Sequence, residues 1–313
     1  MSEPIVQTAP LTFQPLSLCP LCRGNERQRL FPVPVHQEAL GHDKSATLYE
    51  CRDCGLRYFD PCLTPESMGA IYQSSEDLSR RCSAHQTYYE YGDLDKRTQT
   101  LRDFNRGLEM LEAGGKAGSI FEAGYGSGLF LALAKKRGWS VDGIDTSRQN
   151  QELAQKKFQM ALRQGNFNAL SGLEERFDAA AAWDVLEHQS EPHAFLSRLC
   201  GLLKPGGRIL TAVPNDASFL RFLSCGLYRA SFGKLGQGVR KIYVLEHIAY
   251  YNFRTLSRIL RQNGFKVESH FFSSTDLDRY HFNFIERLAA STILTIGRLF
   301  CLENRLIMVA RKT

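Results

Sequence analysis

The chain has 313 residues, 43% of them hydrophobic and 23% charged, and a formal net charge of +6. These values exclude a disordered, collagen-like or coiled-coil chain, and the length predicts one large domain with a smaller module. No uncharged apolar run approaches the ~18 residues of a membrane-spanning helix. The start, MSEPIVQTAP, lacks the apolar core of a signal peptide, so we expect a cytoplasmic protein.

The positive charge is concentrated in the last third of the chain. Residues 216–313 carry 15 Lys/Arg against 7 Asp/Glu, a net of +8, whereas residues 1–66 carry 6 against 8, a net of −2. Such an excess favours an anionic partner, such as phosphates, acidic sugars or a membrane surface. A solvated basic face would give the same counts.

Residues 1–66 contain two Cys-x-x-Cys pairs, Cys19 with Cys22 and Cys51 with Cys54. Two such pairs can bind one tetrahedral zinc ion through four thiolates, which leaves no open position for catalysis. Gly55 suits a turn with positive φ after the second pair. The pattern therefore predicts a structural zinc ribbon. A redox dithiol is the alternative, although it needs only one such pair.

From residue 119 onward, strand and helix patterns alternate. Strands are predicted at 119–122, 140–145, 177–183 and 208–213, and helices at 129–137, 148–158 and 192–203. This alternation predicts a parallel, doubly wound α/β sheet. Ligands bind such sheets outside the carboxyl ends of the strands, which here places the chemistry on the loops after residues 122, 145, 183 and 213.

A glycine-rich loop follows the first of these strands, in the spacing Glu122-Ala-Gly124-Tyr-Gly126-Ser-Gly128. The glycines allow a sharp turn and close approach to a ligand at the start of the next helix. The dinucleotide fingerprint GxGxxG fails, because Leu129 occupies its last position. Asp145 ends the second strand, where a carboxylate can accept hydrogen bonds from both hydroxyls of a ribose. A capping or turn aspartate is the structural alternative.

Over residues 85–313 these motifs, in this order, resemble the class I S-adenosylmethionine-dependent methyltransferases. Gly165-Asn166-Phe167 stands where that family commonly has Gly-Asp at the adenine, and Phe177 to His188 resembles its fourth-strand motif. Lys204–Gly207 and Val213–Asn215 resemble the segment around its fifth strand. The resemblance implies a Rossmann-like sheet that binds the cofactor through Glu122, Gly124, Gly126, Gly128, Asp145, Asn166, Phe167 and Trp183.

The character of the sequence changes near Pro61–Pro65, from paired cysteines and short strand-like runs to a tyrosine-rich stretch that is typical of helix, and this change divides the chain. We expect a zinc-ribbon module at 1–66, a helical linker and cap over the cofactor at 67–115, and a methyltransferase domain at 116–313 with a helical lid inserted at about 216–250. Tyr88, Tyr89 and Tyr91 could cover the sulfonium through cation–π attraction, and Arg97 could pair with the cofactor carboxylate.

Methyl transfer to oxygen or carbon needs a base near the sulfonium. His188 follows the fourth strand, and His247 lies in the segment that often covers the substrate in this fold. Glu246 could orient either histidine or act as the base itself. A purely structural histidine is the alternative at both positions.

Glu246 to Ile248 and Tyr251 to Leu256 are similar to small-molecule methyltransferases near the ubiquinone O-methylating type. We therefore expect O-methylation of a sugar, lipid-linked or natural-product acceptor. An RNA methyltransferase that grips RNA with the ribbon is the alternative, but that module is net acidic and phosphate binding needs clustered basic residues, so no nucleic-acid partner is expected. A non-catalytic cofactor-binding scaffold is a third hypothesis.

Apolar residues recur at helical spacing from Ile285 to Phe300. They predict an amphipathic helix packed on the sheet, followed by an edge strand at 306–310. Peripheral contact of this helix with a membrane, which would suit a lipid-linked substrate, is the alternative.

Overall fold

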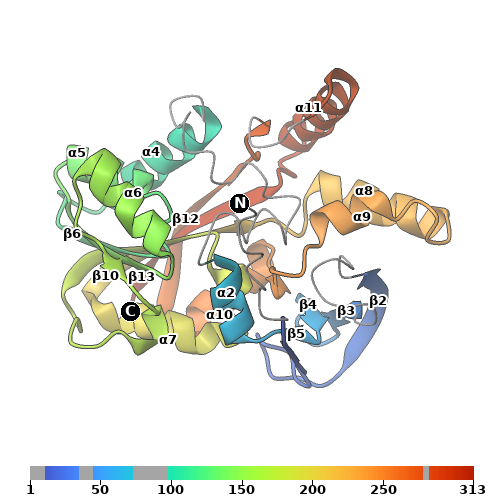
Figure 1. Cartoon of the computed structure of the whole chain (residues 1–313), viewed down its shortest axis with the longest axis horizontal. Coiled ribbons are helices and arrows are strands. Elements are labelled where there is room, and N and C mark those ends of the chain that lie inside the picture. The colour runs from blue at the N-terminus through green and yellow to red at the C-terminus, as the bar shows by residue number, and fades with distance from the viewer. Residues whose placement is uncertain (1–10, 35–44, 73–97, 278–281) are drawn as a thin grey trace, which may run out of the picture.

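The computed structural model describes residues 11–34, 45–72, 98–277 and 282–313. A seven-stranded sheet forms the centre of the molecule, and a four-stranded sheet lies beside it (Figure 1). The central sheet has the order β12-β13-β10-β9-β6-β7-β8. Its strands are β6 (Ser119–Ala123), β7 (Ser140–Asp145), β8 (Arg163–Gln164), β9 (Phe177–Trp183), β10 (Leu203–Pro214), β12 (Phe265–Ser273) and β13 (Arg305–Lys312).

The strands from β10 to β8 run parallel to one another, whereas β13 is antiparallel to both β10 and β12. The chain winds from β6 through β7 to β8 in one direction and then returns to β9 on the other side of β6. This reversal creates a crevice at the carboxyl ends of β6 and β9. The predicted Rossmann-like α/β fold is confirmed. The predicted strand at 306–310 is confirmed as part of β13, but its predicted position at the edge of the sheet is wrong, because β12 pairs with its outer side.

Helices cover both faces of the central sheet (Figure 1). Successive residues of β9 point to opposite faces of the sheet. Ala179 and Ala181 belong to the core between the sheet and helices α4 and α5, whereas Ala180 and Ala182 belong to the core between the sheet and helices α7 and α10. Both faces are buried, as in other parallel sheets. The helices on the two faces are α4 (Thr98–Glu112), α5 (Leu129–Lys136), α6 (Arg148–Phe158), α7 (Pro192–Leu202) and α10 (Phe253–Gln262).

The cysteine-rich module packs directly onto this domain. Its four-stranded antiparallel sheet has the order β11-β4-β3-β2, and its outer strand β11 (Ala249–Tyr250) comes from the predicted lid segment. Ala249 pairs with Tyr58, whose side chain shares one hydrophobic core with α7 and α10. The remaining elements of the module are β1 (Phe13–Gln14), β2 (Arg27–Pro34), β3 (Ser45–Cys51), β4 (Arg57–Asp60), β5 (Cys62–Leu63) and α2 (Pro65–Tyr72).

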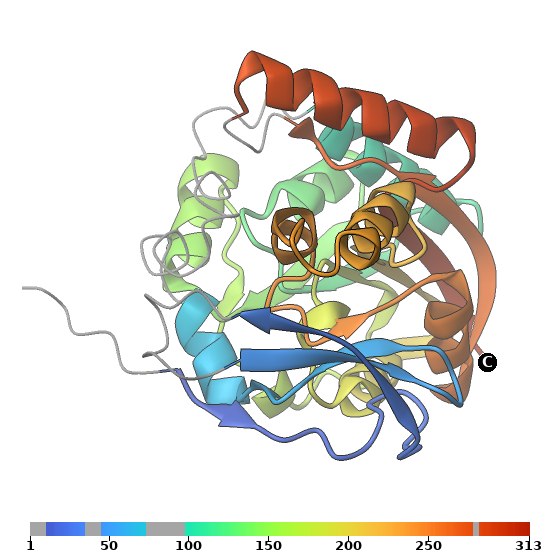
Figure 2. The same ribbon diagram turned by 90° about the vertical axis from the view of Figure 1, so that its right-hand side faces the viewer.

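Three helices extend from one side of the molecule: α8 (Phe219–Ala230), α9 (Gln237–Ile242) and α11 (Phe284–Leu299) (Figures 1 and 2). The predicted C-terminal helix is confirmed, but its packing on the sheet is wrong. Within α11 only Gly297 is buried, and the main packing partner of the helix is α8. A Cβ atom at Gly297 would lie 3.0 Å from the Leu302 carbonyl oxygen, so this glycine lets the chain after α11 approach the helix closely. In the described ranges, no helix combines the length and the hydropathy needed to cross a bilayer.

Candidate active site

A cavity of about 320 Å³ opens at the carboxyl ends of β6, β7 and β9, the place where the strand order reverses. The loops after these three strands line it, together with α2 and Ile248. Its volume is within the range of small-molecule sites. Of the four loops that the strand pattern predicted, those after residues 122, 145 and 183 line the cavity, whereas the loop after residue 213 contributes none of its described lining residues.

The glycine-rich loop between β6 and α5 forms one wall. Gly124, Gly126 and Gly128 have φ angles of +74°, +53° and +79°. A Cβ atom at Gly124 would lie 2.7 Å from a methyl carbon of Val185, so a side chain there is excluded by space as well as by backbone conformation. Gly124 and Gly126 line the cavity, whereas Gly128 is the N-cap of α5.

Asp145 lies at the end of β7 with its carboxylate held in place beside the cavity. Its Oδ2 accepts a hydrogen bond from the Gly126 amide (2.9 Å), and its Oδ1 accepts from the Ser147 amide (2.8 Å) and the Asn150 side chain (3.1 Å). Burial raises the pKa of Asp145, and these hydrogen bonds oppose that shift. Each carboxylate oxygen has more than one acceptor site, so capacity for ribose hydroxyls remains.

Glu122 lies behind the loop and does not line the cavity. Its side chain is 2% exposed, and its Oε2 has no hydrogen-bond partner among the described residues. Burial, together with the nearby charge of Asp145, raises the pKa of Glu122 well above its usual range. A buried carboxyl group with an unused oxygen can donate to or accept from a ligand that reaches it.

Aromatic rings form the rigid side walls. Phe167 packs against Phe121 and Phe195, with ring centroids 6.1 and 5.2 Å away, and Trp183 packs against Phe104 at 4.7 Å. Asn166, beside Phe167, uses its side-chain oxygen to accept from the Asn168 amide (2.9 Å). Asn166, Phe167 and Trp183 all line the cavity, as the sequence predicted for cofactor contacts.

Of the three predicted catalytic residues, only His188 lines the cavity. Its Nδ1 lies 2.6 Å from the backbone carbonyl oxygen of Glu246. Because a carbonyl oxygen can only accept, Nδ1 donates in this contact, and in the neutral ring Nε2 is then the nitrogen that can accept a proton. The His247 ring lies behind His188 at 4.8 Å between centroids, and the Tyr72 hydroxyl is 3.3 Å from the His188 ring nitrogens.

The structure adds Glu187 to this group, a residue that sequence reasoning did not single out. Ligand atoms of Glu187, His188 and His247 all lie within 4.8 Å of one another. Glu187 is 1% exposed, and burial, followed by the charge of Asp184, raises its pKa well above the usual range. Its place directly before His188 was the only signal in the sequence. Glu246 contributes its backbone carbonyl to the orientation of His188.

A family model described as a methyltransferase domain matches residues 93–270 of the chain, which is more than half of its length. The chain belongs to this methyltransferase family.

Curated relatives and solved structures agree with this assignment. The chain is 32% identical over 102 residues to a ubiquinone biosynthesis O-methyltransferase of Alkalilimnicola ehrlichii and 35% identical to one of Methylocella silvestris. Each match covers 31% of this chain and about two fifths of the relative, 41% and 40% respectively. The match therefore spans well under two thirds of either relative.

Two solved structures share the fold. Magnesium protoporphyrin IX methyltransferase from Synechocystis PCC 6803, with bound S-adenosylhomocysteine, has a TM-score of 0.54 at 19% identity and covers 80% of this chain and 100% of its own. The 1,6-didemethyltoxoflavin-N1-methyltransferase from Burkholderia thailandensis has a TM-score of 0.50 at 18% identity. The match covers 87% of this chain and 97% of that enzyme.

The cavity is covered by α2, most of which belongs to the predicted cap at 67–115, and not by the predicted lid at 216–250. Pro65, Met68, Gly69 and Tyr72 line the cavity from this helix, whereas none of its described lining residues comes from α8 or α9. From the predicted lid segment only Ile248 reaches the cavity. The proposed cover by Tyr88, Tyr89 and Tyr91, and the pairing of Arg97, fall outside the described residues.

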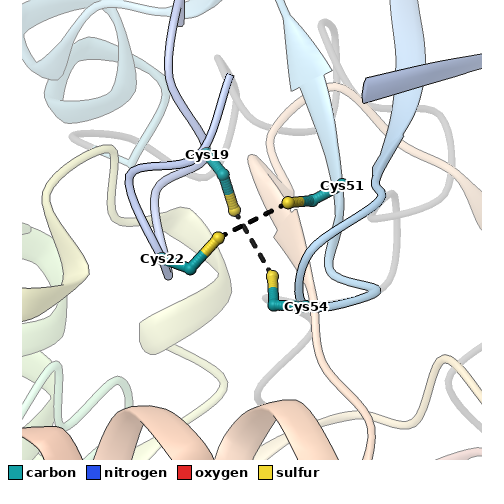
Figure 3. A group of neighbouring side chains, drawn as sticks. All are labelled: Cys19, Cys22, Cys51 and Cys54. Carbon is teal, nitrogen blue, oxygen red and sulfur yellow. Dashed lines mark hydrogen bonds between the residues drawn. The ribbon is translucent and has the colours of Figure 1, made fainter. Parts of the chain in front are cut away.

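The four cysteines of the module converge on one point (Figure 3). The sulfurs of Cys19 and Cys54 are 3.6 Å apart, those of Cys22 and Cys51 are 3.4 Å apart, and all four lie within 4.8 Å of one another. Zinc–sulfur bonds of ~2.3 Å require sulfur–sulfur separations of roughly 3.8 Å in a tetrahedron. Gly55 has the predicted positive φ of +76°, and Arg23 adopts +60° at the matching place after Cys22.

Proposed function

We propose that this methyltransferase transfers a methyl group to an oxygen of a small-molecule acceptor, of the sugar, lipid-linked or natural-product type. The observation that carries the proposal is that His188 lines the cavity while its Nδ1 lies 2.6 Å from the Glu246 carbonyl oxygen, an arrangement that suits a general base acting through Nε2. The relatives named as ubiquinone biosynthesis O-methyltransferases support oxygen as the acceptor atom.

The residues around the cavity fit S-adenosylmethionine. Asp145 would accept from its ribose hydroxyls, Asn166 and Phe167 would flank its adenine, and the backbone at Gly124 and Gly126 would approach its methionine part. Glu122, buried behind that loop with an unused oxygen, is placed to complete this end of the site. When bound, the cofactor supplies an activated methyl group as a sulfonium.

His188 would remove the proton of the acceptor hydroxyl through Nε2. The Glu246 carbonyl holds the other nitrogen, so the ring keeps the tautomer that a base requires. Glu187 and His247, whose ligand atoms lie within 4.8 Å of those of His188, would hold its ring in position. His247, Glu246 and Glu187 therefore act behind His188 rather than on the acceptor.

We further propose that Cys19, Cys22, Cys51 and Cys54 hold a structural zinc ion. Four thiols at this spacing match the ligand set of closed zinc sites, and three of the four are buried. The cluster is shared between the loop before β2 and the turn after β3, so the ion would join the two ends of the module.

One set of variants tests the cofactor site and the base together. Asp145→Ala should lower the affinity for S-adenosylhomocysteine by at least about tenfold in titration calorimetry, because a buried hydrogen-bonding carboxylate is lost. Asp142→Ala, on the same strand but outside the cavity, should bind normally. His188→Asn should keep that affinity while methyl transfer to hydroxyl acceptors falls by about 10²-fold or more.

The two halves of the proposal fail separately. Equal affinities for the Asp145 and Asp142 variants would remove the ribose site. Tight cofactor binding without turnover on any sugar or lipid-linked hydroxyl acceptor would favour the scaffold hypothesis, and methylation of RNA instead would favour the RNA alternative.

A further inference from the structure

Large apolar side chains are exposed on one part of the molecule. Of the exposed large hydrophobics in the described ranges, all but Leu18 and Phe253 lie on α8, α11 or the turns that follow these helices. We call this region the α8/α11 surface. It consists of Phe222, Leu227, Phe232, Leu235, Phe284, Ile285, Leu288, Leu299, Phe300 and Leu302. Both helices extend from the same side of the molecule (Figures 1 and 2).

The helix α11 is apolar on both faces. Its inner face, which includes Leu294 and the buried Gly297, is directed toward the protein, while Phe284, Leu288 and Leu299 recur on the opposite face. Phe284 is 82% exposed. A helix on a protein surface normally has a polar outer face, so this face is suited to contact with another apolar phase.

The turn after α8 presents a second apolar group. Phe232 is 94% exposed and has a positive φ of +49°. The turn is hydrogen-bonded on both sides of it, by the Gly233 amide to the Tyr228 carbonyl (2.9 Å) and by the Leu235 amide to the Ser231 hydroxyl (2.9 Å). The backbone therefore holds the phenyl ring outward.

Basic residues accompany these apolar groups. Residues 219–242 contain five Lys/Arg and no Asp/Glu, and Arg229, Lys234 and Arg240 among them are exposed. Exposed cations next to inserted aromatic side chains are what an anionic lipid surface binds. A second copy of the chain would instead place these cations against one another, so charge disfavours a symmetric dimer through this surface.

We propose that the α8/α11 surface docks the methyltransferase on the face of an anionic lipid bilayer, with Phe232 and Phe284 inserted among the lipids. The chain leads from α9 directly to Glu246 and His247, which adjoin the proposed base. Docking would therefore bring the acceptor side of the site near the membrane. Among the proposed acceptors, docking on a bilayer favours a lipid-linked one. Only this choice of acceptor rests on the proposed function.

Vesicle flotation of the full-length, zinc-loaded protein tests the proposal. We expect binding to phosphatidylcholine vesicles that contain phosphatidylglycerol, and binding at least about tenfold weaker to phosphatidylcholine alone. The double variant Phe232→Ser/Phe284→Ser should bind at least about tenfold more weakly, because two phenyl rings lose their burial. Phe253→Ser, an exposed aromatic on α10, is the matched control and should bind as the parent does.

A charge variant provides a second measurement. Arg229→Gln/Lys234→Gln/Arg240→Gln should lose about fivefold in affinity per residue for the anionic vesicles, and its binding should become less sensitive to salt.

Equal flotation of the parent and the double phenylalanine variant would overturn the proposal, as would failure of the parent protein to float with either kind of vesicle. A dimer in solution that the Phe284→Ser change dissociates would assign the surface to a second copy and overturn it too. S-adenosylhomocysteine titration of the same variants should be unchanged, so a failed cofactor site is distinguished from a failed docking surface.

Discussion

At the residue scale, three buried carboxyl groups lie near the cavity. Glu122 and Glu187 are almost fully buried, and burial raises the pKa of both well above the usual range. Asp145 is also buried, but it accepts three hydrogen bonds that favour its charged form. The site thus combines one carboxylate held by three hydrogen bonds with two carboxyl groups that favour retaining a proton.

Glu122 makes stability depend on pH in a predictable direction. Above its ordinary pKa of about 4.5 the unfolded chain loses this proton while the folded chain keeps it, so the folded state loses stability as pH rises toward the raised pKa. The loss is at most about 1.4 kcal/mol per pH unit. The Glu122→Gln variant lacks this pH-dependent loss, so the free energy of unfolding of the variant relative to the parent protein should increase from pH 5 toward pH 8.

Urea unfolding across that pH interval measures the difference. Glu152→Gln, at an exposed carboxylate on α6, is the control, and its difference from the parent should not vary in the same way. A Glu122→Gln difference that is constant with pH would contradict the shifted pKa.

At the element scale, the cysteine cluster and the cavity are linked through α2. The strand β4 follows the second cysteine pair, and β5 and α2 follow β4 within a few residues. Leu63 and four residues of α2 line the cavity. The Phe59 amide on β4 also donates to the carbonyl oxygen of Ile248 (3.0 Å), so the module is hydrogen-bonded to a residue that lines the cavity.

Zinc removal should therefore weaken cofactor binding as well as stability. We expect Cys51→Ser to lose the bound zinc, measured by mass spectrometry, to lower the melting temperature by at least about 5 °C, and to weaken S-adenosylhomocysteine binding at least about tenfold. Cys301→Ser, at an exposed cysteine, should change none of these. Normal cofactor affinity in zinc-free protein would show that α2 keeps its place without the cluster.

At the scale of the whole molecule, a buried ion network joins the module to the methyltransferase domain. Asp216 accepts from Arg221 (2.9 Å) and from the Tyr243 hydroxyl (3.1 Å), and it lies 3.4 Å from Arg57 on β4. Arg221 also stacks over the Tyr250 ring at 4.4 Å. This network and the shared core predict that the module and the domain unfold together.

Asp216→Ala should lower the free energy of unfolding by about 3 kcal/mol or more, because two arginines lose their shared buried carboxylate. Calorimetry should show one transition in the parent protein. Glu152→Ala, which breaks an exposed pair with Arg148, should change stability by no more than about 0.5 kcal/mol. Two separate transitions in the parent would contradict the joint unfolding of module and domain.

Local features of this protein were determined by its sequence alone. The positive φ angles at Gly124, Gly126 and Gly55, the cap at Ser147 and the strand–helix alternation depend on neighbouring residues, so they could be predicted. The place of Asp145 beside the cavity follows from that alternation, because parallel strands end at one edge of the sheet, whereas the place of Phe167 was implied by the family resemblance.

Only the tertiary structure decided which distant segments meet. It placed β13 inside the sheet, joined β11 to the cysteine module, and put α2 rather than the helices of 216–250 over the cavity. It also brought Glu187 and His247 behind His188 and left the apolar face of α11 exposed. Periodicity shows that a helix has an apolar face, but the partner of that face depends on packing between residues far apart in the chain.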